Sequence, residues 1–172
     1  MVKQQNMILA SALMLALVII PVALYFVVSG DAEALRMPSL PLLLALPAAG
    51  VLVHVALETI GYRTQPIAPG TPEDEARSQS VARWQAQMVQ RFAFSEAIAI
   101  VSVALCFVVS PGGYVLTLVG CATSLALMAV HVYPWTRPVT RFADALEKDG
   151  ARSGLLEAFG MQPRSGGAIQ EL

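Results

Sequence analysis

The chain has 172 residues, of which 56% are hydrophobic and only 13% are charged, and its formal net charge is −1. Soluble domains carry about 25% charged residues, so this composition excludes an ordinary soluble enzyme domain. Because the Lys and Arg residues form no soluble basic face, we expect no nucleic-acid partner. The charged residues gather in short stretches, and the apolar runs between them are long enough to cross a lipid bilayer.

Four apolar runs predict four transmembrane helices. They cover residues 7–28, 39–60, 92–109 and 114–133. The last two are joined only by Ser110-Pro111-Gly112-Gly113, which is typical of a tight turn. We therefore expect an all-α membrane protein, with an antiparallel four-helix transmembrane bundle within residues 1–136 and a cytoplasmic loop at 62–91.

The distribution of Lys and Arg predicts the orientation. Only Arg36 falls between the first two spans. The other ten lie in the N-terminal segment, the long loop and the tail: Lys3, Arg63, Arg77, Arg83, Arg91, Arg137, Arg141, Lys148, Arg152 and Arg164. Because cationic loops stay in the cytoplasm, we expect an inner- or plasma-membrane protein with both termini cytoplasmic. Four aromatic residues near the cytoplasmic ends of the spans are expected to be interfacial anchors: Trp84, Trp135, Tyr62 and Tyr133.

Two segments of the chain are nearly identical. VALYFVVS at residues 22–29 and VALCFVVS at 103–110 differ at one position, and each ends a predicted span. The match indicates either two tandem helical hairpins, as in some transporters, or chance similarity between two segments that are built from the same few apolar residue types.

The cytoplasmic segments are also predicted to be helical. No helix breaker occurs between Pro72 and Pro111, so the third helix is expected to be long and to begin outside the membrane. In the tail, 137–172, apolar residues recur at helical spacing from Val139 to Leu146. This amphipathic tail is expected to lie on the bilayer, dock on a partner, or pack on the chain's own loop.

Four ionisable residues fall inside the predicted spans: His54, Glu58, Glu96 and His131. Glu58 and Glu96 are each about 7 Å along a helix from the nearest arginine, and His54 is about 13 Å from Arg63. His131 lies six residues before Arg137. We therefore expect all four in the cytoplasmic half of the membrane. Such residues are costly in hydrocarbon and often functional. Because His54 and Glu58 are four residues apart, they share one helix face.

These four residues have two readings. A cluster of Glu and His suits a proton or a divalent cation, although no pattern identifies a particular metal or cofactor. Alternatively, the acids are structural and pair with a nearby arginine at the headgroup layer. The candidate charge partners are Arg63, Arg91 and Arg137.

The segment Ser95-Glu96-Ala97-Ile98-Ala99-Ile100 resembles the helix around the ion-carrying carboxylate of the c-type subunits of rotary ATPases. The resemblance covers six residues and implies an ion-binding role for Glu96. The chain departs from that family in lacking its dense glycine repeat, and Glu96 is shallower than the family's mid-membrane carboxylate.

Enzyme signatures are missing from the sequence: it has no Gly-rich phosphate loop and no GxSxG, HExxH or CxxC pattern. We therefore expect a non-enzymatic accessory or scaffold subunit, with the bilayer, a protein bound through the cytoplasmic helices, or a second copy as partners. The alternative is a proton- or cation-coupled transporter or channel that uses the inner-leaflet Glu/His cluster.

Overall fold

The computed structural model describes residues 2–162, and within them the protein is all-α, with no strand. The helices are α1 (Val2–Val28), α2 (Leu40–Thr59), α3 (Glu73–Val108), α4 (Gly113–His131), α5 (Thr136–Leu146) and α6 (Leu155–Ala158). The first four are long and apolar enough to cross a membrane, which confirms the four expected candidate spans. The end of the predicted tail, residues 163–172, lies outside the described residues.

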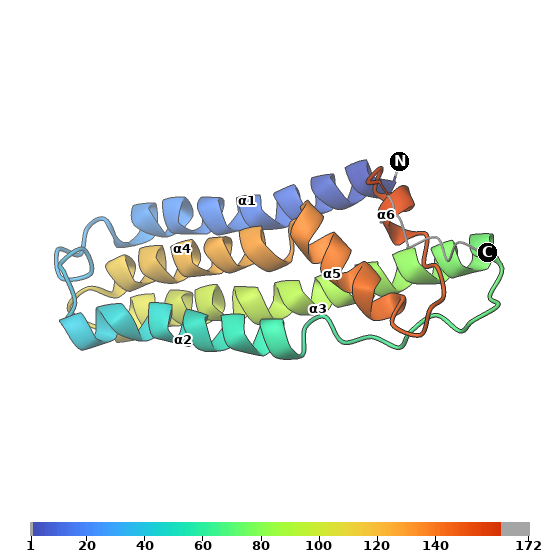
Figure 1. Cartoon of the computed structure of the whole chain (residues 1–172). Helices are drawn as coiled ribbons and strands as arrows, with labels where there is room; N and C mark the ends of the chain where they lie inside the picture. Colours follow the sequence, from blue (N-terminus) through green and yellow to red (C-terminus); the bar gives the residue numbers. More distant parts are fainter. Residues whose placement is uncertain (1, 163–172) are drawn as a thin grey trace.

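The four long helices run side by side, and α4 lies between α1 and α2 while packing along α3 (Figure 1). Many of the residues that face outward are apolar: Phe26, Leu52 and Val108 are each more than 70% exposed. In water such a surface would be unfavourable, because apolar burial is the main driving force of folding. The surface is therefore suited to lipid.

Small residues allow α4 to approach its neighbours closely. A Cβ atom added to Gly120 would collide with the side chain of Ser102 on α3, and one added to Gly50 on α2 would collide with Thr123. The hydroxyl of Thr117 also donates a hydrogen bond to the Ser102 carbonyl oxygen at 3.0 Å. Close backbone approach at small residues is a common way for helices to pack in membranes.

The third helix is longer than a bilayer requires, as its sequence predicts. It has 36 residues, or about 54 Å at 1.5 Å per residue, whereas the hydrocarbon core is about 30 Å thick. Its first half continues past the end of α2, where α5 and α6 fold against it (Figure 1).

We call this assembly of the first half of α3 with α5 and α6 the cap. Its apolar core is closed around the fully buried rings of Trp84 and Phe159, whose centroids lie 5.3 Å apart. The buried members are Tyr62, Ile67, Ala76, Trp84, Val139, Phe142, Ala143, Leu146, Leu155, Leu156, Ala158 and Phe159. The amphipathic tail thus packs its apolar face on the chain's own loop and α3, one of the three arrangements expected for it.

Candidate functional site

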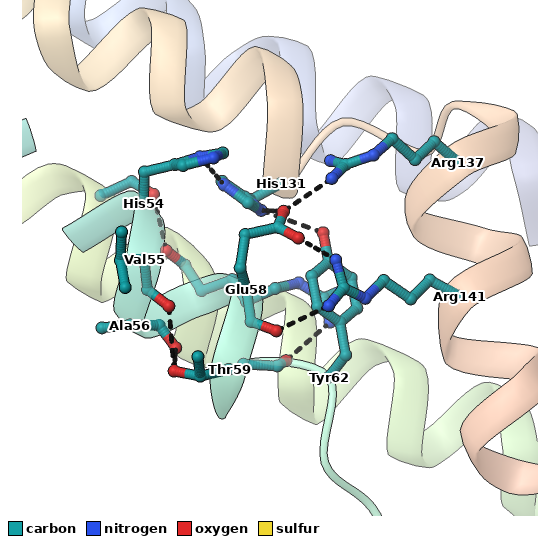
Figure 2. A network of polar contacts seen from close by, with 12 residues as sticks. His54, Val55, Ala56, Glu58, Thr59, Tyr62, His131, Arg137 and Arg141 are labelled. Atoms are coloured by element: carbon teal, nitrogen blue, oxygen red, sulfur yellow. Dashed lines mark hydrogen bonds and ion pairs between the residues drawn. The ribbon is translucent and has the colours of Figure 1, made fainter. Parts of the chain in front are cut away.

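A cluster of polar side chains lies where the bundle meets the cap (Figure 2). His54, Glu58 and Tyr62 are spaced four residues apart, at the end of α2 and in the turn after it, and so point to the same side. His131 ends α4, and Arg137 and Arg141 lie one turn apart on α5. We call these six residues the boundary cluster.

The two histidines and Tyr62 form a continuous chain of polar contacts. Nδ1 of His54 lies 2.9 Å from Nε2 of His131, and Nδ1 of His131 lies 3.0 Å from the Tyr62 hydroxyl. His131 is fully buried, whereas His54 is partly exposed. Both ring nitrogens of His131 are therefore satisfied, as buried polar groups require.

Burial raises the pKa of the Tyr62 hydroxyl above its usual value, so this group stays protonated at neutral pH. When it donates to Nδ1 of His131, the neutral ring carries its own proton on Nε2. That proton is then donated to Nδ1 of His54. The chain of contacts thus has a consistent direction from Tyr62 to His54.

Glu58 joins the cluster to α5. One of its carboxylate oxygens accepts a hydrogen bond from Arg137 at 2.8 Å, and the other accepts one from Arg141. Arg141 also donates to the Glu58 backbone oxygen at 2.7 Å, which caps the end of α2. This pair of arginines satisfies the carboxylate and fixes the cap against the bundle.

The cluster also contains a possible cation site. One donor atom from each of His54, Glu58 and His131 lies within 4.8 Å of the others, and two imidazoles with a carboxylate are a common zinc ligand set. The two arginines on Glu58 oppose this use, because a cation would have to displace at least one of them and approach a net positive charge.

The structure brings His54, Glu58 and His131 together but places Glu96 elsewhere. Glu96 lines a groove of about 350 Å³ between α1 and α3, the Glu96 groove, whose other lining residues are Leu17, Ile20, Ala23, Leu24, Val27, Ala99, Ile100 and Val103. The carboxyl is half-buried, and no described residue forms a hydrogen bond or ion pair with it.

The three expected charge partners have different surroundings. Arg137 pairs with Glu58, whereas Arg63 donates from Nε to the Thr59 backbone oxygen at 3.0 Å. Arg91 is fully buried in the cap, where it donates to the Gly61 carbonyl oxygen and stacks on Trp84 at 4.7 Å. Arg91 makes no ion pair among the described residues.

The four aromatic residues expected at the membrane interface fall into an exposed pair and a buried pair. Trp135 is exposed, and its ring lies 4.5 Å from that of the partly exposed Tyr133, where the bundle ends. Trp84 and Tyr62 are instead buried inside the protein. These two rings pack in the cap core rather than on a lipid-facing surface.

Sequence reasoning missed Arg141 as a partner of Glu58 and Tyr62 as a partner of His131. A signal for both was present in their spacing. Tyr62 continues the four-residue stripe of His54 and Glu58, and Arg141 lies four residues after Arg137. What could not be read from spacing was that α5 turns back onto the end of α2.

No protein-family model, curated protein or solved structure matches the chain. The resemblance of the Glu96 segment to c-type subunits is therefore limited to the six residues that carry it, because no family model supports it.

Proposed function

We propose that the chain is a non-enzymatic accessory subunit of a membrane complex, with both termini in the cytoplasm. Ten of its eleven Lys and Arg residues fall on the side assigned to the cytoplasm, in agreement with the positive-inside rule. The cap then lies in the cytoplasm and the boundary cluster lies at the inner surface of the membrane.

The observation that carries this proposal is the carboxyl of Glu96 in its apolar groove. Charged side chains in hydrocarbon are costly, with an upper figure of about 2.5–3.5 kcal/mol at the bilayer centre on insertion scales, and no described residue pairs with this one. A helix of another subunit, seated between α1 and α3, would supply a hydrogen-bond donor or a cation to Glu96. A lipid chain would fill the groove but has no donor along its length.

The groove has the extent of a helix contact. It runs along α1 from Leu17 to Val27, which is about 15 Å of helix. It has Ala23 on α1 and Ala99 on α3 among its walls. Small side chains of this kind let a neighbouring helix approach closely.

Photo-crosslinking in the cells that express the protein tests this proposal. A photoreactive residue at Ile100, which is 61% exposed and lines the groove, is compared with one at Leu52, which is 72% exposed on α2. We expect one membrane polypeptide to be captured from Ile100 only. Glu96→Leu should abolish that capture, and Glu96→Gln, which keeps a hydrogen-bonding side chain, should retain most of it.

Capture of lipid alone from Ile100, or the same polypeptides from Leu52, would refute the accessory role of the groove. A product of twice the mass of the chain would instead identify a homo-oligomer, the other association expected from the sequence.

A second candidate function is proton or cation coupling at the boundary cluster, which is favoured by the convergence of His54, Glu58 and His131 within 4.8 Å. It predicts ion flux in proteoliposomes that His131→Ala reduces by roughly tenfold or more, as expected for loss of a ligand or relay group. Glu96→Gln, outside the cluster, should leave the flux unchanged. Flux equal to that of empty vesicles would exclude this function.

A further inference from the structure

Besides the Glu96 groove, the surface has a cleft next to the boundary cluster, between the end of α2 and α5. Its volume is about 590 Å³. Its polar and charged lining residues include Glu58, Tyr62, Arg63, Thr64, Arg141 and Lys148. We call it the basic cleft, and no part of the accessory role proposed above uses it.

The charge of the basic cleft suits an anion. Three cations, Arg63, Arg141 and Lys148, line it against the single carboxylate of Glu58. That carboxylate also accepts a hydrogen bond from Arg137, which lies just beside the cleft. The cleft therefore keeps a net positive charge after its internal ion pairs are formed.

Two of the cations have donors available for a ligand. Arg63 uses Nε for the Thr59 carbonyl oxygen, and its two terminal nitrogens make no hydrogen bond to any described residue. Lys148 makes no ion pair within the described part of the chain. A guanidinium presents a planar fork that matches a phosphate group, and an ammonium adds a point charge.

The position of the cleft indicates where the phosphate comes from. The cleft begins at the last turn of α2, where the apolar run of that helix ends. Just inside this level, one turn before Thr59, Val55 is about half exposed and presents an apolar side chain to acyl chains. Basic pockets at the cytoplasmic ends of spans are where anionic headgroups bind.

We propose that the basic cleft binds the phosphate headgroup of an anionic phospholipid of the inner leaflet, with Arg63 and Lys148 as its principal contacts. Arg141 divides its donors between this headgroup and Glu58. The lipid thereby contacts both α2 and α5 and ties the cap to the membrane surface. This inference rests on the membrane placement of the helices and is independent of the Glu96 groove.

The experiment measures lipid binding to the full chain, purified in a neutral detergent, by native mass spectrometry with added phosphatidylglycerol or phosphatidylcholine. The double variant Arg63→Gln/Lys148→Gln is compared with Arg77→Gln/Arg152→Gln, which removes the same charge from exposed positions of the cap. Each cation near an anionic surface strengthens the attraction of an anionic headgroup about fivefold. We therefore expect phosphatidylglycerol to bind the cleft variant at least roughly tenfold more weakly.

The control variant should bind phosphatidylglycerol as the unmodified chain does, and neither should retain phosphatidylcholine selectively. Equal weakening in both variants would overturn the proposal, because it would indicate diffuse charge attraction rather than a site. Inorganic phosphate is added in a separate arm. If it displaces phosphatidylglycerol at equal concentration, the cleft is a site for a soluble phosphate ligand, and the assignment to lipid is overturned.

Discussion

The side chain of Tyr62 is buried, and its hydroxyl contacts Nδ1 of His131. Both properties depend on the position that the turn after α2 gives to this residue. It lies three residues beyond the last helical position of α2, yet it continues the stripe of His54 and Glu58. An aromatic ring here packs in the cap core, while its hydroxyl reaches back into the boundary cluster.

The raised pKa of Tyr62 predicts alkaline sensitivity. In the unfolded chain a tyrosine ionises near pH 10, whereas in the folded protein the hydroxyl holds its proton to higher pH. Unfolding therefore releases a proton above about pH 10, and the free energy of unfolding falls as the pH rises from there. Tyr62→Phe should reduce this fall and cost about 1–2 kcal/mol at neutral pH, because Nδ1 of His131 loses its donor.

Thermal unfolding in detergent, followed by circular dichroism across the alkaline range, measures this effect. Tyr133→Phe, at a ring outside the boundary cluster, is the matched control and should behave as the unmodified chain does. If both variants keep the same alkaline fall, the pH dependence belongs to other groups.

Single residues also explain which parts of the candidate site were predictable. The pairing of His54 with Glu58 follows from their four-residue spacing on one helix, and their depth near His131 follows from helix rise. The separation of Glu96 from them could not be read from the sequence. It depends on the rotation of α3, which turns Glu96 toward α1 while Arg91, five residues earlier, faces the cap core.

Of the four candidate spans, α4 has the largest share of buried residues. It touches α1, α2 and α3, and its glycine and hydroxyl residues are what make the contact with α3 close. The length of its apolar run predicts that α4 spans the bilayer, but it does not predict which span is most buried in the bundle.

Gly120→Ala is expected to destabilise the α3–α4 contact. The new Cβ would overlap the Cβ and Oγ of Ser102, which lie too close to the α3 backbone to move away cheaply. Overpacking of this kind costs about 1–3 kcal/mol, which outweighs the helix propensity of alanine, about 1 kcal/mol in its favour. The melting temperature in detergent should therefore fall.

Gly30→Ala is the control for this prediction, because a Cβ at Gly30 meets nothing within 4 Å. Its melting temperature should stay close to that of the unmodified chain. If Gly120→Ala were as stable as the control, the two helices could not be packed as closely as the structure has them.

For the whole molecule, the sequence predicted the helical class and the four candidate spans because both depend on local properties, namely apolar length and helix breakers. The cap was not predictable in the same way. The amphipathic spacing from Val139 to Leu146 indicated an apolar face but not its partner, and the partner is Trp84 on a distant part of the chain. The tandem-hairpin interpretation remains a prediction.

Trp84 leaves the ribosome long before Phe142 and Phe159, the two rings that cover it. Until α5 and α6 are synthesised, the first half of α3 has its apolar face open, and chains fold largely in the order in which they are made. If α3 and α4 cross the membrane as their length and composition allow, the cap also requires α4 to have returned across it, since only then do α5 and the start of α3 lie on one side. Closure of the cap is thus a late event in biogenesis, and in a membrane-inserted chain it reports that the last two candidate spans have been inserted correctly.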